Sequence, residues 1–76
     1  MSSTASMQSH RPELLDVVAL LAGRPDLGLR RGAVGTVVEP LDDLTSLVEF
    51  SDDAGQAQSI VACPHRGLLV VSSAQA

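Results

Sequence analysis

The sequence predicts an all-β fold: a small, partly open barrel of about five short strands. Short runs rich in Val, Leu and Ile alternate with breaks rich in Gly, Pro and Asp. The chain has 76 residues, which is enough for one domain with a small core. Phe50 is the only aromatic residue, so that core must be mainly aliphatic. We expect residues 1–12 to be a disordered tail, residues 13–72 to form the barrel and residues 73–76 to fray.

The first apolar run, residues 13–22, fits two kinds of element. Pro12 suits the first turn of a helix, and Gly23 suits the end of one. The same run is nearly all apolar, which is typical of a strand that is buried on both faces. Periodicity alone does not decide between helix and strand.

The segment after this run is a loop. Glycine, proline and aspartate interrupt the apolar pattern over residues 23–31. We expect Leu27 and Leu29 to tuck inward and hold this loop against the barrel.

Residues 32–39 form the clearest strand, which Pro40 ends. Val34 and Val37 are three positions apart, so a regular strand would point them to opposite faces. Because isolated glycines in strands often mark bulges, we expect a bulge at Gly35 to direct both valines into the core.

The rest of the chain alternates between strands and turns. The predicted order is strand 45–51, hairpin turn 52–55, strand 56–62, a 3₁₀ turn within 63–67 and strand 68–72. We expect Val48, Phe50 and Ile60 to point into the core. A long first loop, a central hairpin and a short turn before the last strand are typical of SH3-like barrels.

Three motifs, in this order, resemble a known family. They are Leu-Asp-Val-Val-Ala-Leu at residues 15–20, Arg-Gly-x-Val-Gly-Thr-Val-Val at residues 31–38 and Val-Glu-Phe at residues 48–50. The chain is similar over residues 13–71 to small bacterial proteins catalogued as domain of unknown function 4926. The resemblance implies an SH3-like barrel and makes residues 16–21 the first strand. It implies no established activity and supplies no catalytic residues.

The resemblance also suggests two settings for the protein. Some relatives lie beside other small proteins in a way that indicates toxin–antitoxin or immunity pairing. The barrel is also similar to that of the nitrile hydratase β subunit, which accompanies a separate catalytic subunit. That second likeness concerns the fold alone, and a fold does not imply a function. Residues 63–67 depart from the relatives' charged or polar turn, which leaves the register of the last strand open.

Composition argues against several function classes. The formal net charge is −4, with five Arg, no Lys and nine acidic residues, so phosphate binding is poorly supported. Tyr and Trp, which stack on bases, are absent. No run approaches the roughly 18–20 apolar residues of a membrane span, and residues 1–8 do not resemble a signal peptide. Cys63 is the only cysteine, so no internal disulfide can form. We expect a cytoplasmic protein that binds neither nucleic acid nor membrane.

Cys63 and His65 are the pair with ligand or nucleophile chemistry. His65 or Arg66 could favour a thiolate, but nucleophilic catalysis also needs an orienting third group, which the sequence does not fix. Zinc usually takes four ligands, and the other histidine is His10. We expect Cys63 to end a strand and His65 to be an exposed turn residue.

Two other patterns have simple structural explanations. The aspartate pairs at residues 42–43 and 52–53 lack the spaced oxygens of a calcium loop. Gly32 and Gly35 are not followed by the Lys and Ser or Thr of a phosphate-binding loop. We therefore expect no catalytic residue, no cofactor and no metal site, and we expect that the protein is not an enzyme.

Two groups of residues predict a contact surface. Arg24, Arg30 and Arg31 cluster around the first loop, where an acidic segment of a partner could dock. The first and last strands carry more apolar side chains than one face of so small a barrel needs. We expect four of these side chains to form an exposed apolar face, which usually marks association. They are Val18, Leu20, Leu69 and Val71.

The prediction is a non-catalytic protein-interaction module in a bacterial cytosolic protein, as the antitoxin or immunity partner of a neighbouring protein. The alternative is an accessory or regulatory subunit of an enzyme complex. We expect a protein partner and a homo-oligomer, a dimer or larger, because a core this small has little stability to spare.

Overall fold

The computed structural model describes residues 11–51 and 58–74 of the chain. Five antiparallel strands follow one another along these residues: β1 (Val17–Leu20), β2 (Val34–Pro40), β3 (Thr45–Ser51), β4 (Gln58–Pro64) and β5 (Leu68–Ser72). Two short turns of 3₁₀ helix are also present in this part of the chain: η1 (Pro25–Leu27) and η2 (His65–Gly67).

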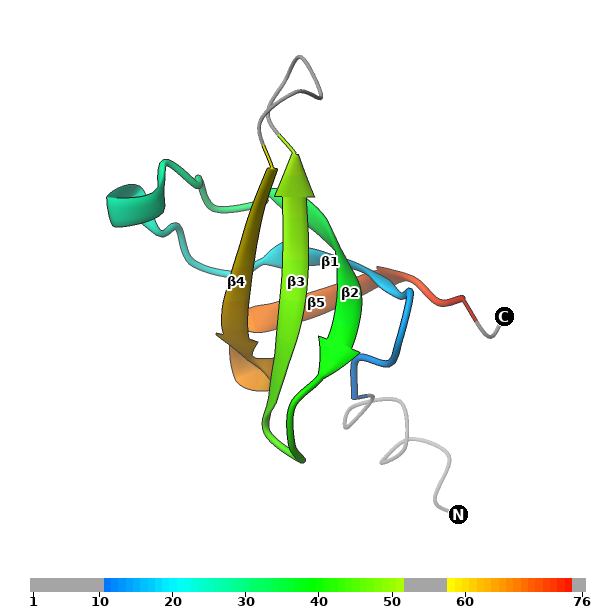
Figure 1. The fold of residues 1–76 in the computed structure, drawn as a ribbon. Helices are drawn as coiled ribbons and strands as arrows, with labels where there is room; N and C mark the ends of the chain where they lie inside the picture. The colour runs from blue at the N-terminus through cyan, green and yellow to red at the C-terminus, as the bar shows by residue number, and fades with distance from the viewer. Residues whose placement is uncertain (1–10, 52–57, 75–76) are drawn as a thin grey trace.

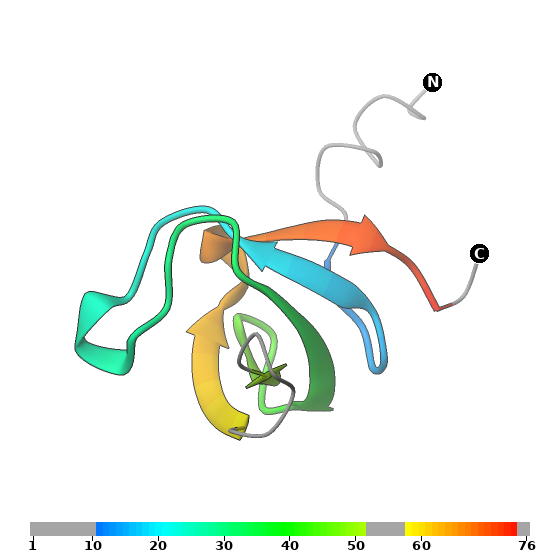
Figure 2. The same cartoon turned by 90° about the horizontal axis from the view of Figure 1, so that it is seen from above.

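The strands form one sheet in the order β4-β3-β2-β1-β5, so β4 and β5 are its two edges. In Figure 1, β2, β3 and β4 run side by side, and β1 and β5 cross behind them. Seen from above in Figure 2, the sheet curls around the core, and the loop between β1 and β2 projects from one side. The predicted all-β, partly open barrel is confirmed. The tail residues 1–10 and the hairpin turn at residues 52–55 lie outside the described residues.

β1 is a strand with a neighbour on each side, so the helical interpretation is wrong. Leu20 N–H donates to the Ala33 carbonyl at 2.9 Å, and the Leu20 carbonyl accepts from Gly32 N–H at 2.8 Å. On the other side, Leu21 N–H donates to the Gly67 carbonyl at 2.9 Å. β1 is apolar on both faces, although Val18 and Leu20 are buried and Val17 and Ala19 are half-buried.

The core is small and aliphatic around one aromatic ring. In the part of the chain that the structure describes, the buried apolar residues are Val18, Leu20, Val37, Val48, Phe50, Cys63 and Leu68. The inward orientation of Val48 and Phe50 is therefore confirmed.

The prediction for Ile60 is wrong, because 60% of this side chain is exposed. The cause is the register of β4 on β3, in which Ser46 lies opposite Cys63 and Glu49 lies opposite Ile60. Directly paired residues share a face, so Cys63 points inward with Ser46, and Ile60 points outward with Glu49.

Gly35 does not kink β2 as predicted. The register shift of β2 on β3 falls between Val37 and Glu39, and Val34 is 56% exposed. Gly35 is itself buried, and a Cβ atom on it would lie 2.7 Å from Val48 Cγ1 and 2.8 Å from Phe50 Cδ1. Its role is therefore to leave room for core side chains rather than to bend the strand.

The predicted loop is present and contains η1, and an isolated bridge joins Arg24 to Leu29 at its base. Leu29 packs against the core as expected, but Leu27 is 40% exposed. At the other end of the chain, η2 and β5 lie where the sequence predicts them.

A buried carboxylate joins the two ends of the barrel. Asp16 is fully buried; its Oδ2 accepts from Glu13 N–H, and its Oδ1 accepts from Ala74 N–H, both at 2.9 Å. Asp16 N–H also donates to the Glu13 carbonyl, which closes a turn in which Leu15 has a φ of 70°. That left-handed conformation is uncommon for a residue with a side chain. The bond to Ala74 ties the start of the segment that is predicted to fray to the barrel.

Gly35→Ala is expected to lower the free energy of unfolding by about 1–3 kcal/mol, because the added methyl group overpacks the core. Chemical denaturation measures this loss. Gly67→Ala is the matched control, since no atom lies within 4 Å of the added methyl group, and its effect should stay within about 0.5 kcal/mol. Equal effects of the two substitutions would contradict the packing role of Gly35.

Asp16→Asn is expected to lower the free energy of unfolding by about 1–3 kcal/mol, because an amide NH₂ group would face one of the two backbone N–H groups that donate to the buried carboxylate. The control is Asp43→Asn, whose side chain is 92% exposed and which should change stability very little. Thermal and chemical unfolding of both variants test this. If Asp16→Asn lowers the free energy of unfolding no more than Asp43→Asn does, the Asp16 carboxylate does not hold the two ends of the barrel together.

Candidate functional site

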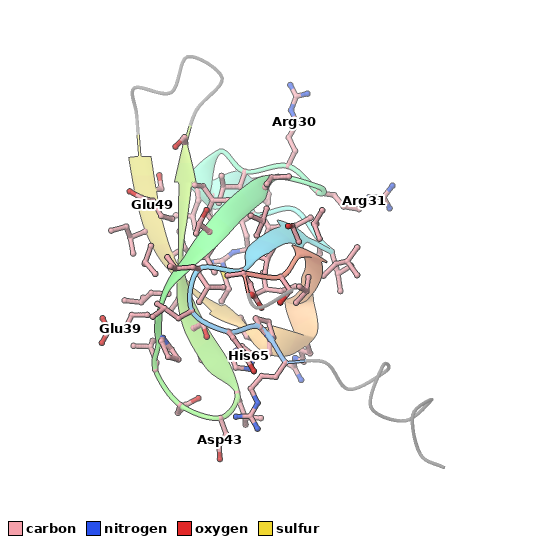
Figure 3. All side chains as sticks on the ribbon, turned by 90° about the vertical axis from the view of Figure 1, so that its right-hand side faces the viewer. Arg30, Arg31, Glu39, Asp43, Glu49 and His65 are labelled. Carbon is pink, nitrogen blue, oxygen red and sulfur yellow. The ribbon has the colours of Figure 1, made fainter. Side chains whose placement is uncertain are left out.

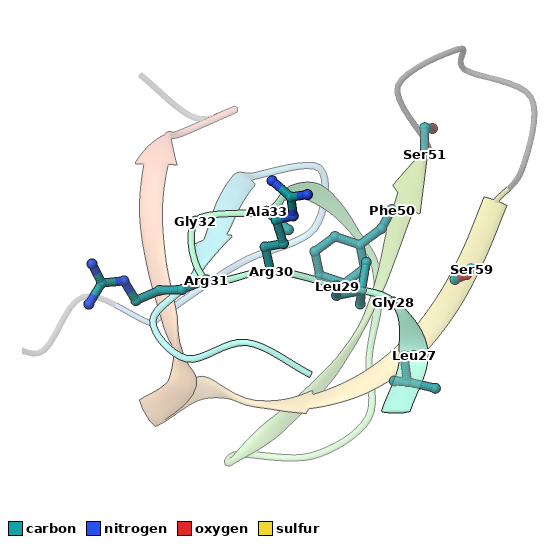
Figure 4. Close-up of a pocket in the computed structure, with 10 residues that line it drawn as sticks. All are labelled: Leu27, Gly28, Leu29, Arg30, Arg31, Gly32, Ala33, Phe50, Ser51 and Ser59. Atoms are coloured by element: carbon teal, nitrogen blue, oxygen red, sulfur yellow. The ribbon is translucent and has the colours of Figure 1, made fainter. Parts of the chain in front are cut away.

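A hollow of about 590 Å³ lies between the β1–β2 loop and the ends of β3 and β4 (Figure 4). The residues that line it are Leu27, Gly28, Leu29, Arg30, Arg31, Gly32, Ala33, Phe50, Ser51 and Ser59. Most of them belong to the loop, and the rest come from the strands beside the central hairpin. The hollow therefore joins segments that are far apart in the sequence.

The loop can form this wall because two of its glycines take left-handed conformations. Gly28 has a φ of 72° and ends η1, and Gly32 has a φ of 86° just before β2. Such angles are strained for residues with a side chain. Between the two glycines the chain presents Arg30 and Arg31.

The hollow combines an apolar floor with a basic rim. Phe50 is only 2% exposed and lies at the base, where Leu29 packs against the core. Arg30 and Arg31 are exposed and project away from the loop in Figures 3 and 4. Among the described residues that line the hollow, they are the charged ones. Each guanidinium offers five N–H donors, so the rim suits carboxylate groups.

Arg24 does not join the other two arginines at the rim. Its Nε atom lies 3.6 Å from Asp26 Oδ1. It also lies close enough to Cys63 to favour the thiolate electrostatically. The structure thus brings together two members of the predicted arginine cluster and sets the third apart.

The predicted apolar face needs a correction. Val18 and Leu20 are buried in the core, at 0% and 6% exposure, because these alternate residues of β1 point inward. Leu69 and Val71 are exposed as predicted, each at 56%.

The residues that share the outer side with Leu69 and Val71 follow from the pairing. Ala19 lies opposite both Leu69 and Val34, and Val17 alternates with the buried Val18. We call this set the outer apolar face. It consists of Val17, Ala19, Val34, Leu69 and Val71.

A serine–histidine pair joins β3 to η2. Ser46 Oγ and His65 Nε2 are 2.8 Å apart, and Ser46 is fully buried. A nucleophile must reach its substrate, and this hydroxyl has no access to solvent. His65 is half-buried rather than exposed, because its ring is held by Ser46 and its backbone N–H donates to the Leu44 carbonyl. Sequence reasoning missed Ser46; its alternation with Val48 and Phe50 was the available signal.

Cys63 lies opposite Ser46 and is 2% exposed. Burial raises the pKa of its thiol above the usual value of 9.0, and Arg24 opposes that rise. The thiol therefore stays protonated near neutral pH, which makes it a poor nucleophile and a poor metal ligand.

The structure gives the other candidate ligands separate roles. Among the described residues, no three His, Cys, Asp or Glu side chains come together in a way that could hold a metal ion. Asp42 Oδ1 accepts from Leu44 N–H at 2.8 Å, and Asp43 Oδ1 lies 3.4 Å from Arg11 Nη1. His10 and the pair at residues 52–53 lie outside the described residues.

A family model described as Domain of unknown function (DUF4926) matches residues 14–70. No curated protein and no solved structure matches the chain significantly. Within the described part of the chain, no helix has the length and apolar character needed to cross a membrane.

Stability is expected to fall as the pH rises above about 9, and thiol reagents should label native Cys63 much more slowly than the unfolded chain. The unfolded thiol ionises first, because only the folded state holds its pKa above 9.0. The chain has no Lys or Tyr to titrate in the same range. Denaturation at several pH values measures the slope, which Cys63→Ala should lack. Equal labelling rates in both states would contradict the burial of the thiol.

Proposed function

The chain belongs to the family described as Domain of unknown function (DUF4926), and we propose that it is a non-catalytic module that binds a protein partner. The hollow with the basic rim is its contact site. The ligand is an acidic segment of the partner, which lays carboxylate side chains against Arg30 and Arg31.

One observation carries this proposal: the local charge of the hollow is opposite to that of the chain. The formal net charge is −4, yet within residues 11–51 and 58–74 the charged residues that line the hollow are two arginines. In Figure 3, Glu39, Glu49 and Asp43 lie away from these arginines. Complementary charge steers encounter and fixes the register of a bound segment.

The apolar floor supports a peptide ligand rather than a simple anion. Leu27, which is 40% exposed, and the half-buried Leu29 offer apolar surface beside the guanidinium groups, with Phe50 buried beneath. A contact site for a peptide commonly combines an apolar anchor with a charged rim. An acidic segment with one apolar side chain meets both requirements.

The setting that we propose is a bacterial cytosolic pair in which this chain acts as the antitoxin or immunity partner of a neighbouring protein. The family resemblance supports this setting. A second candidate, by analogy of fold alone with the nitrile hydratase β subunit, is an accessory or regulatory subunit of an enzyme complex. A neighbouring gene for a large catalytic subunit favours the second candidate.

Reversal of either rim charge, by Arg30→Glu or Arg31→Glu, is expected to weaken binding of an acidic segment at least tenfold. The reason is that each variant replaces an attraction with a repulsion inside the hollow. The first probe is a hexaglutamate peptide, and NMR of the full-length chain detects its binding. Hexaglutamine is the uncharged control peptide. Amide shifts should concentrate at residues 27–33 and 50–51.

The native chain and the two variants then serve as baits to capture the natural partner from a lysate of the source organism. A partner captured by the native chain should be lost with Arg30→Glu and Arg31→Glu. It should be retained with Arg11→Glu, which makes the same charge change at an exposed site outside the hollow. Equal loss with all three variants, or hexaglutamate shifts spread over the whole barrel, would overturn the proposed site.

A further inference from the structure

We propose that β5 is a docking edge for a second copy of this chain. Two chains pair β5 against β5 in an antiparallel manner, about a two-fold axis that passes beside Val70. This goes beyond the binding of an acidic segment and uses a surface outside the hollow. The inference rests on which residues of β1 hydrogen-bond to β5, on the composition of the β5 edge and on the charges at its two ends.

The hydrogen bonds of β1 determine which backbone groups of β5 face outward. Leu20 uses both its N–H and its carbonyl on the β2 side, whereas Leu21 N–H donates to Gly67 on the β5 side. Antiparallel strands alternate in this way, so Ala19 bonds to β5 and its neighbours in β1 bond to β2. The residues opposite those neighbours are Leu68 and Val70. Their carbonyls, and the Val70 N–H, therefore point away from β1 along the edge of the sheet.

The β5 edge has one irregularity, a register shift on β1 that leaves Val71 as an extra residue between Val70 and Ser72, but it lacks the side chains that usually prevent strand pairing. β5 reads Leu-Leu-Val-Val-Ser, without a charged residue or a proline. Natural edge strands commonly carry lysine, proline or inward-pointing charges that prevent pairing. The other edge, β4, ends in Pro64 and sets its exposed Ile60 beside Glu49. Proline disfavours pairing at an edge, so β5, which has none, is the edge suited to a second copy.

Pairing at β5 also joins the outer apolar faces of the two copies. With Val70 opposite its own equivalent, Leu69 of each copy lies opposite Val71 of the other. Both side chains are 56% exposed in the single chain. Apolar cross-strand pairs of this kind stabilise a sheet. Because the outer apolar face carries no charge, it is a surface on which two acidic chains can meet without repulsion.

The charges at the two ends of β5 select the antiparallel arrangement. Arg66 is exposed and immediately precedes Gly67, which bonds to β1. At the other end, Ala74 and the exposed Glu13 both donate backbone N–H groups to the Asp16 carboxylate. A two-fold axis at Val70 brings residue 66 of one copy toward residue 74 of the other. Arg66 then approaches Glu13 of the second copy, and the same contact is repeated on the other side of the axis.

The test is sedimentation of the full-length chain from micromolar to millimolar concentrations. We expect a monomer–dimer equilibrium in the native chain, and Leu69→Lys should raise the dimer dissociation constant at least tenfold by burying a charge in the apolar pair. The matched control is Ile60→Lys, which replaces an equally exposed residue on the other edge and should change the constant less than twofold. Thermal unfolding of both variants confirms that each remains folded.

Two further measurements address the geometry. Amide exchange at Val70 should slow as concentration rises, while exchange at Ala19 should not change. Arg66→Glu alone should weaken the dimer, and Arg66→Glu combined with Glu13→Arg should restore it. A native chain that stays monomeric at millimolar concentration would overturn the proposal. A dimer dissociation constant that Leu69→Lys leaves unchanged would overturn the β5 pairing. Failure of the combined Arg66→Glu and Glu13→Arg substitutions to restore the dimer would also overturn it.

Discussion

The architecture depends on one close approach, at the position where β2 has no side chain. Gly35 lies opposite Val18 of β1 and Phe50 of β3, and the Phe50 ring and the Val48 methyl group fill the space that a Cβ atom would need. The only aromatic side chain can therefore lie under β2 and still reach the base of the hollow. Core packing and the floor of the candidate site are thus two consequences of the same glycine.

Strand content was largely predictable, whereas strand register was not. The limits of β3 and β5 follow from apolar runs between clear breakers, which are local signals. β4 shows the difference: its largest apolar residue, Ile60, lies outside, while Cys63 fills the inner position. Pairing with β3 decides this, and a shift of one residue exchanges the faces. For β1 even the element type was ambiguous from the residues, because its outward residues are apolar like its buried ones and the sequence lacks the alternation that would identify a strand.

The part of the candidate site that could be predicted is the part that local sequence alone indicates. The basic rim follows from two adjacent arginines in a loop, since exposed loops carry charge in most folds. By contrast, the assignment of Val18 to the surface failed, because every residue of β1 is apolar and no polar neighbour marks the outer side. The buried polar residues Asp16 and Ser46 were also missed. Their partners, Ala74 and His65, are distant in sequence and meet them only in the folded chain.

The two proposed surfaces are compatible, and together they have a consequence that neither has alone. The hollow lies on the β1–β2 loop and the hairpin side of the barrel, whereas the docking edge is β5, so one chain can use both. A dimer formed through β5 carries two hollows at a fixed separation. A partner with two acidic segments, or a dimeric partner, would bind the second hollow at a high effective concentration. Weak contacts at Arg30 and Arg31 can then support stable binding, and a small barrel with a shallow site needs no deep pocket to hold its partner.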